Sequence, residues 1–600
     1  MLTAHQIRLI KRLLFLLIPY SLLRVGFYFY HLNIYKHFTQ EEIFESFLLG
    51  VRFDIAAILL VNAIPLLLSF FSTFNHKFLT FERTLFIVLN TAAFIVALDD
   101  YELFLFLGKR LSFDFFVISE DILQQLPQIF LHYWYLPIVG ILFGVGFYFF
   151  DKKYFVLKNK KHTWFSYVNG VLLLGLAFIG IRGGLQHKSI NVQSAFIQGK
   201  NELGHLVLNT PYHFLRTLKN KPMKPVTYFA SDDEAKNVIL NKRDLRDGIK
   251  GIPKANIVLI ILESFSLEYV EKGFTPFLKE LELKALSFTR HLANGRRSVE
   301  ALPSLLCGLP SLLEEPISKS IFQGNKFNCV PNILKNAGYT NYFFHAGSRG
   351  TMGFESYTLA NGFHRYFSRE DYGKNDYDGT WGIYDLPYLQ YVADEISRMP
   401  EPFMAGVFTL SSHQPYGIPE EFKGKFPKGS LEIHESIGYV DFALRKFFDK
   451  VKNEPWFKNT LFIITSDHTQ KLESVKFMNM VGRYRVPLIL YGPEVGVGES
   501  TKVTQHSDIP RSILDYVELS GELPATSVSV FGEDEGVALN FADGSTHYMA
   551  TKNSVQTLDH EFLYDWETGE MGKPVAARSL LLKAYLQYFM NGLINNNLSL

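Results

Sequence analysis

Long runs without Lys, Arg, Asp or Glu dominate the first third of the 600-residue chain. A helix that crosses a bilayer needs about 20 mostly apolar residues. The pattern therefore predicts five transmembrane helices within residues 1–183, rather than the buried helices of a soluble protein or a cleaved signal peptide. The runs lie at residues 13–31 (interrupted only by Arg24), 55–76, 84–98, 122–150 and 163–181.

Basic residues are distributed unevenly among the segments between these runs. Arg8, Lys11 and Arg12 precede the first helix, and the segments after the second and fourth helices are also rich in Lys and Arg. The segments after the first and third helices contain more acidic than basic residues. By the positive-inside rule, we expect the N-terminus in the cytoplasm and everything after the fifth helix outside it.

Beyond residue 254, short hydrophobic runs alternate with helical patterns. The runs 256–262, 341–345, 403–410, 460–465 and 486–491 are strand candidates, and 275–284 and 435–451 are helix candidates. Such continuous hydrophobicity is typical of strands buried on both faces, and the alternation predicts a mostly parallel sheet covered by helices. We expect a transmembrane domain at 1–183, a helical connector at 184–253 and an extracytoplasmic α/β domain at 254–600.

Charge and cysteine content exclude several classes of protein. The formal net charge is +1. The composition therefore gives no support for a strongly basic, nucleic-acid-binding face. Two cysteines exclude a disulfide-rich scaffold and a cysteine-based zinc site. Cys307 and Cys329 both fall in the predicted external domain, where a disulfide is compatible with the compartment. Cys307 also lies in an apolar helical run that favours a buried thiol, so their pairing stays open.

Polar side chains directly follow three of the predicted strands. Glu263 follows the strand 256–262, Asp467 and His468 follow the strand at 460–465, and His413 follows the run that ends at residue 410. In sheets of this kind, ligands collect at the carboxyl ends of the strands. Two carboxylates and imidazole nitrogens suit a hard divalent cation. Taken singly, an Asp or Glu after a strand is more often a helix cap or a turn residue, and a lone His is more often structural.

Ser298 lies in the segment 294–310, NGRRSVEALPSLLCGLP, which opens with a turn and continues as a helical pattern. A helix N-terminus favours anions, and a metal can turn a nearby hydroxyl into a nucleophile. The alternative is that Ser298 only caps the helix. Arg296 and Arg297 precede it and are candidates for anion binding or for solvated loop positions.

Seven motifs occur in an order that resembles the lipoteichoic acid synthase family: ILESF, NGRRS, SSHQPY, YVDFALRKFF, TSDHT, VPLILYGP and QHSDIP. The resemblance implies a sulfatase-like fold of the alkaline phosphatase superfamily behind a five-helix anchor in the bacterial cytoplasmic membrane. It also implies a manganese-dependent phosphoglycerol transferase that uses phosphatidylglycerol, while related enzymes transfer phosphoethanolamine. Its partners are then a membrane phospholipid donor and a glycan or lipid acceptor.

The resemblance also assigns roles to individual residues. Glu263, Ser298, Asp467 and His468 become ligands of one divalent ion, Mn²⁺ first and Mg²⁺ or Zn²⁺ as alternatives. Ser298 takes the place of the family's nucleophilic threonine, with a glycine ten residues later as in the wider superfamily. His413 matches a histidine that contacts the substrate head group. His506 is a candidate for a second metal or for a structural role.

The sequence departs from the family at the glycerol-phosphate pocket. The Trp and Arg that line it are absent from TMGFESY at 351–357, and Arg349 and Trp381 are the nearest substitutes. We therefore expect transfer of a phospholipid head group through a phospho-serine, with a hydrolase or a non-catalytic lipid sensor as alternatives. A true sulfatase has Pro and Arg two and four positions after its nucleophile, where this chain has Glu300 and Leu302.

Overall fold

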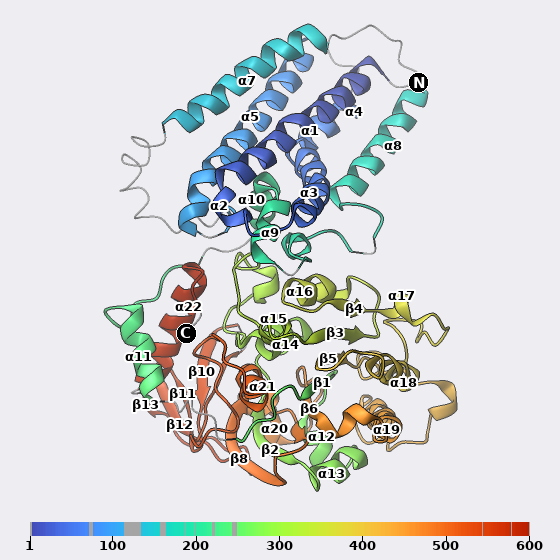
Figure 1. Cartoon of the computed structure of the whole chain (residues 1–600), viewed down its shortest axis with the longest axis vertical. Coiled ribbons are helices and arrows are strands. Elements are labelled where there is room, and N and C mark those ends of the chain that lie inside the picture. Colours follow the sequence, from blue (N-terminus) through green and yellow to red (C-terminus); the bar gives the residue numbers. More distant parts are fainter. Residues whose placement is uncertain are drawn as a thin grey trace. The chain divides into compact units, whose positions relative to one another are not determined.

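The computed structural model describes residues 3–70, 76–107, 109–112, 134–155, 164–186, 188–198, 200–218, 223–242, 249–542, 544–577 and 579–598. Its internal contacts divide the chain into two units. One unit comprises Met1–Lys224 with Gln323–Asn325, and the other comprises Pro225–Phe322 with Lys326–Leu600. The first is helical and the second is α/β (Figure 1).

Long apolar helices build the first unit. Two described helices, Ala4–Tyr30 and Thr80–Leu105, are long and apolar enough to cross a membrane, which supports membrane anchoring. Helices coincide with all five predicted runs, although residues 71–75, 122–133 and 163 of those runs lie outside the described residues. The helices are α1 (Ala4–Tyr30), α2 (Leu32–Tyr35), α3 (Gln40–Val61), α4 (Ala63–Phe70), α5 (His76–Leu107), α7 (Tyr135–Tyr154), α8 (Trp164–Ile181), α9 (Asn201–Val207) and α10 (Thr210–Thr217).

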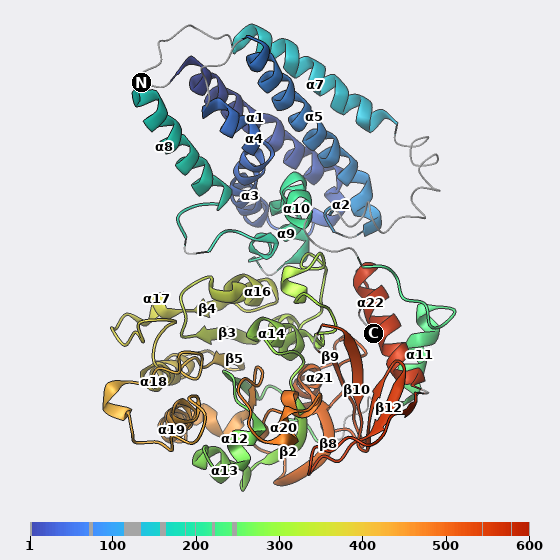
Figure 2. The same ribbon diagram turned by 180° about the vertical axis from the view of Figure 1, so that it is seen from behind.

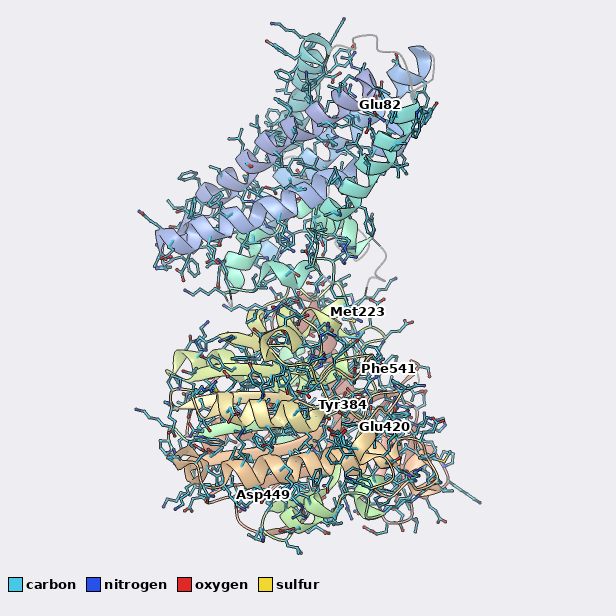
Figure 3. All side chains as sticks on the ribbon, turned by 90° about the vertical axis from the view of Figure 1, so that its right-hand side faces the viewer. Glu82, Met223, Tyr384, Glu420, Asp449 and Phe541 are labelled. Carbon is cyan, nitrogen blue, oxygen red and sulfur yellow. A yellow bond between two sulfur atoms is a disulfide. The ribbon has the colours of Figure 1, made fainter. Side chains whose placement is uncertain are left out.

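Buried charges in the helical unit are paired with one another. Arg12 of α1 forms ion pairs with Glu82 of α5, labelled in Figure 3, and with Asp151 of α7. Arg110 pairs with Asp100 at 2.8 Å. Charges in an apolar helical bundle are costly unless they find such partners, so these pairs allow the helices to pack closely.

An eight-stranded sheet forms the centre of the α/β unit, in the order β4-β3-β5-β1-β6-β7-β2-β8. The predicted parallel sheet is confirmed, except that β7 runs antiparallel to both of its neighbours. Every residue of β1 and β6 is buried, as their continuous hydrophobicity predicts. The strands are β1 (Asn256–Leu262), β2 (Leu286–Leu292), β3 (Thr340–His345), β4 (Arg365–Phe367), β5 (Phe403–Phe408), β6 (Thr460–Ser466), β7 (Leu488–Tyr491) and β8 (Gly498–Gln505).

A second, antiparallel sheet lies near the C-terminal end and was not predicted. Its order is β13-β12-β11-β10-β9, and its strands are β9 (Ala538–Ala542), β10 (Thr546–Ala550), β11 (Ser554–Thr557), β12 (His560–Leu563) and β13 (Val575–Ala576). The strands have only two to five residues, and most of them contain polar ones, so no hydrophobic run marks them. Phe541, labelled in Figure 3, identifies β9.

Helices cover the sheets and complete the core. Val258 and Ile260 of β1 pack in one cluster with residues of α12, α13, α18 and α19, so burial of apolar surface fixes the central strands. Helix α11 lies beside α22 (Figure 2). The helices are α11 (Asp232–Lys242), α12 (Leu267–Glu271), α13 (Pro276–Glu282), α14 (Ser298–Cys307), α15 (Val330–Asn336), α16 (Phe354–Ala360), α17 (Arg369–Tyr372), α18 (Asp385–Ile396), α19 (His434–Val451), α20 (Val475–Met478), α21 (Ile509–Tyr516) and α22 (Leu580–Ile594).

A disulfide joins Cys307 to Cys329, which answers the question that the sequence leaves open. Cys307 is the last residue of α14, and Cys329 is the N-cap of α15. The bond therefore ties the helix that begins with Ser298 to the next helix along the chain.

Candidate functional site

Glu263, Asp467 and His468 meet where two neighbouring strands end. Strands β1 and β6 pair in parallel as far as Leu262 and Ser466, so the residues that follow them emerge side by side. All three side chains are buried, and one ligand atom from each lies within 4.8 Å of the other two. His468 Nε2 is 3.2 Å from Asp467 Oδ2 and 3.7 Å from Glu263 Oε1.

Hydrogen bonds hold these ligand atoms in place. The Ser264 N–H donates to Asp467 Oδ1 at 2.8 Å, and the Ser264 hydroxyl donates to Glu263 Oε1 at 2.6 Å. His468 Nδ1 lies 2.8 Å from the Thr469 carbonyl oxygen. Because a carbonyl only accepts, Nδ1 must carry the proton, and the Nε2 lone pair is left facing the two carboxylates.

The electrostatics of this cluster match a site for a cation. Burial, and then the neighbouring Asp467, raise the pKa of the Glu263 carboxyl well above its ordinary value. Asp467 Oδ2 is buried and accepts no hydrogen bond from the described residues. A divalent cation would stabilise the charged form of Glu263 and would provide a partner for Asp467 Oδ2. Two carboxylates with one imidazole suit Mn²⁺, Mg²⁺ or Zn²⁺. The residues therefore fit the metal that the fold implies.

Ser298 points into the same cluster from the first turn of α14. Its Oγ lies 3.3 Å from Glu263 Oε2 and 3.3 Å from His468 Nε2. The alternative that Ser298 caps the helix is wrong, because Arg297 is the N-cap residue and Ser298 is the first helical residue. Glu300 accepts the Arg296 and Arg297 N–H groups at 2.8 and 3.0 Å, which leaves the serine hydroxyl for the cluster. This role of Glu300 was not predicted, although its place three residues after the N-cap is a capping-box signal.

His413 lies beyond strand β5, which pairs with β1, so it belongs to the same edge of the sheet. Its ring centroid is 4.3 Å from that of Trp381, and the Trp381 indole N–H donates to the Gln414 carbonyl at 2.7 Å. Arg349 is instead engaged by Glu355 and Asp371, each at 2.7 Å. Of the two substitutes considered for the missing pocket residues, Trp381 is thus the one beside His413.

His345 and His506 are fully buried outside the cluster of three ligands. Burial, and then His413, lower the pKa of His345 to about 3, and its Nδ1 lies 2.8 Å from the Tyr366 hydroxyl. His506 Nδ1 accepts the Asn294 N–H at 3.3 Å. The metal-ligand group found among the described residues does not include His506, so its contacts favour the structural alternative.

Comparison with known proteins agrees with this geometry. Residues 255–519 match the family model described as Sulfatase. The chain contains a sulfatase-family domain. This match covers Glu263, Ser298, His413, Asp467 and His468.

Curated relatives match part of the chain. Phosphoglycerol transferase I of Citrobacter koseri is 27% identical over 267 residues, which are 40% of this chain and 34% of that protein. Phosphoglycerol transferase I of Escherichia coli is 27% identical over 265 residues, with the same coverage of both proteins. The chain therefore spans about a third of the length of these relatives.

Solved structures resemble the chain at the level of the fold. A protein in the alkaline phosphatase superfamily from Vibrio parahaemolyticus aligns with a TM-score of 0.54 and 19% identity, covering 70% of this chain and 98% of that one. The lipoteichoic acid synthase LtaP from Listeria monocytogenes aligns with a TM-score of 0.49 and 17% identity, covering 61% and 98%. The first of these likenesses shows the fold that the chain shares with a solved structure.

Proposed function

We propose that the protein is a metal-dependent transferase that moves a phospholipid head group, phosphoglycerol or a similar group, to an envelope glycan or lipid acceptor. The observation that carries the proposal is the position of Ser298 Oγ, 3.3 Å from both Glu263 Oε2 and His468 Nε2. A hydroxyl held against buried metal-ligand candidates at a helix N-terminus is suited to nucleophilic attack on a phosphodiester. The names of the distant relatives support the same reaction class.

In this proposal Glu263, Asp467, His468 and Ser298 hold one divalent ion, with Mn²⁺ preferred over Mg²⁺ and Zn²⁺. When bound, the ion lowers the pKa of the serine hydroxyl and offsets negative charge on the phosphoryl oxygens. Ser298 is the nucleophile. His413 binds the head-group phosphate or donates a proton to the leaving group, and Trp381 supports its ring.

The reaction has two balanced steps. Ser298 Oγ gives up its proton and forms a bond to phosphorus as the bond to the diacylglycerol oxygen breaks, and that oxygen takes up one proton as diacylglycerol leaves. The acceptor hydroxyl then bonds to the same phosphorus, the Ser298 Oγ–phosphorus bond breaks, and the serine regains its proton. Ser298 is only 6% exposed, and this burial limits the access of water to the phospho-serine.

The proposed location is the bacterial cytoplasmic membrane. Five helices within residues 1–183 would span it with the N-terminus inside, and the domain at 254–600 would lie outside after a connector at 184–253. Apolar helices in the first unit and the paired charges between them support this arrangement. The Cys307–Cys329 disulfide supports an oxidising compartment. A membrane anchor keeps the site near a lipid donor.

Two other functions would use the same fold. A hydrolase of the phosphodiesterase or sulfatase type would pass the group on Ser298 to water, and the Sulfatase family match favours considering it. A non-catalytic lipid sensor would leave the donor intact. Full-length protein incubated with radiolabelled phosphatidylglycerol and an envelope glycan distinguishes them: label on the glycan supports transfer, free glycerol phosphate indicates hydrolysis, and unchanged lipid indicates a sensor.

A further inference from the structure

Asn540 of strand β9 holds the turn that leads into Ser298. Its Oδ1 accepts the Gly295 N–H at 3.1 Å, and its Nδ2 donates to the Ala293 carbonyl at 3.0 Å. The side chain is fully buried. One amide therefore binds the backbone on both sides of Asn294, and it comes from a strand 245 residues further along the chain than Gly295.

The residue between these two bonds is held just as firmly. Asn294 Nδ2 donates to Gln505 Oε1 at 3.0 Å and to the Leu539 carbonyl at 2.8 Å. Asn294 Oδ1 accepts the Ser507 N–H at 2.9 Å. A buried network in which every member is satisfied is rigid, whereas one missing partner exposes the others to a large desolvation cost. The turn is thus fixed by two asparagines that use all their side-chain hydrogen-bonding atoms.

Gly295 allows the turn to pack closely against helix α14. Its φ of +114° lies in the region that favours glycine, and an added Cβ would lie 2.6 Å from Glu300 Cβ. Glu300 packs against the turn and accepts the next two backbone N–H groups. Ser298 follows directly, so displacement of the turn displaces its hydroxyl.

We propose that Asn540 is a positioning residue for the Ser298 nucleophile. The five-stranded sheet β9–β13 then contributes to the active site by holding the turn that precedes Ser298. This inference rests on the proposed function of Ser298. It goes beyond the family match, which ends at residue 519, before strand β9 begins. Asn540 does not touch the substrate; it keeps Ser298 Oγ within reach of Glu263 and His468.

The position of a nucleophile affects the rate of the chemical step more than substrate affinity. A misplacement of about 1 Å can lower a rate roughly 100-fold. Loss of Asn540 should therefore lower kcat with little change in the KM for the lipid donor, and metal content should remain unchanged because the ligand residues are untouched. Asn540→Asp keeps an acceptor for the Gly295 N–H but places a buried carboxylate oxygen against the Ala293 carbonyl, so its loss should be at least as large as that of Asn540→Ala.

Asn256 provides a matched control. It is also a fully buried asparagine, its Oδ1 accepts the Phe403 N–H at 3.1 Å, and its Nδ2 donates to Glu401 at 2.7 Å. It lies at the amino end of β1, opposite the end that carries Glu263. Asn256→Ala should reduce thermal stability without selective loss of kcat.

The test compares Asn540→Ala, Asn540→Asp and Asn256→Ala in the full-length protein, using two readouts. Hydrogen exchange measures protection of the backbone amides at 293–299, and trapping of phospho-Ser298 from phosphatidylglycerol measures the chemical step. We expect exchange about tenfold faster in Asn540→Ala, phospho-serine formation roughly 10–100-fold slower, and neither change in Asn256→Ala.

The two readouts separate failure of this inference from failure of the proposed function. If the turn exchanges as in the wild type in Asn540→Ala, or if Asn256→Ala slows the chemical step equally, the positioning role is overturned. If the wild-type protein forms no phospho-serine, the proposed function fails, while faster exchange in Asn540→Ala still supports the hold on the turn.

Discussion

The hydroxyl of Ser298 lies 3.3 Å from a carboxylate oxygen of Glu263, although 35 residues separate them in the chain. The serine belongs to a helix start and the glutamate to a strand end, so the site depends on the alignment of two elements. Packing of α14 against the rest of the α/β unit is therefore as important to the chemistry as either residue.

Replacement of Ser298 by alanine should abolish transfer. We expect a loss of at least about 10³-fold in kcat, as is typical when a nucleophile is removed, while Glu263, Asp467 and His468 still bind the metal, with lower affinity. Ser298→Thr should retain measurable transfer because it keeps a hydroxyl. Ser304→Ala, a buried serine of the same helix that bonds to Leu309, serves as the control. Transfer by Ser298→Ala at the rate of this control would contradict the proposed nucleophile, as measured with labelled donor lipid.

Removal of the metal should inactivate the protein and lower its thermal stability. An ion at 100 times its dissociation constant stabilises the folded state by about 2.7 kcal/mol, so chelation followed by dialysis should lower Tm, and added Mn²⁺ should restore it. Asp467→Asn should not bind the ion, and its Tm should not respond to chelation or to added Mn²⁺. Asp441→Asn is a matched control, because that buried carboxylate accepts the Phe277 and Leu278 N–H groups instead. Elemental analysis showing equal metal in both variants would argue against the site.

Loss of His413 should weaken substrate binding more than the chemical step. In the proposal an incoming phosphate contacts the half-buried ring beside Trp381, and a lost hydrogen bond to a charged group costs about 1.5–3 kcal/mol. We expect the KM for the lipid donor to rise roughly tenfold or more in His413→Ala. The exposed His560 of strand β12 provides the control substitution. Initial rates over a range of donor concentrations measure this, and an unchanged KM would remove His413 from the substrate site.

Loss of the Cys307–Cys329 disulfide should destabilise the α/β unit. The bond closes a loop with a sequence separation of 22 residues, for which the loss of loop constraint costs about 3 kcal/mol. Reduction, or Cys307→Ser with Cys329→Ser, should therefore lower Tm by several degrees. Free thiols in protein isolated from intact cells under non-reducing conditions would speak against both the bond and the proposed external location.

The stability of the α/β unit should fall as the pH is lowered below about 6.5, partly because of His345. Burial lowers its pKa to about 3, whereas the unfolded chain binds a proton near pH 6.5. Between these values only the unfolded state binds the proton, so each unit by which the pH falls lowers the free energy of unfolding by about 1.4 kcal/mol. Above pH 6.5 the contribution of His345 is constant. Thermal unfolding between pH 7.5 and 5 should show a smaller slope for His345→Gln. His560→Gln, at an exposed position, is the control. If the stability of His345→Gln depends on pH as steeply as that of the wild type, His345 is not a source of the pH dependence.

Much of the fold could be predicted because its strands are continuous hydrophobic runs. The strand at 256–262 coincides with β1, and the helix at 435–451 with α19. Strand β8, GESTKVTQ, could not be found in this way, because its first residues are exposed or half-buried and polar. The antiparallel direction of β7 depends on its neighbours β2 and β6, which its own hydrophobic sequence does not reveal.

The candidate site was predicted residue by residue, but not the network that supports it. Glu263 and His468 follow strands that the sequence reveals, so their meeting follows from a parallel sheet. Asn540 lies on a short strand in a sheet that periodicity does not mark, and its side-chain Oδ1 accepts the Gly295 backbone N–H. Such a contact depends on how segments far apart in sequence pack in the folded domain, and a local sequence pattern does not predict that packing.

The bond between Gly295 and Asn540 also determines when the site becomes complete during synthesis. A chain that emerges from the ribosome exposes Ser298 first, acquires Asp467 much later and gains Asn540 last. If Asn540 holds the serine as we propose, the hydroxyl reaches its full reactivity only after most of the α/β unit has been made. An unfinished chain would then attack the lipids around it far more slowly than the folded domain does.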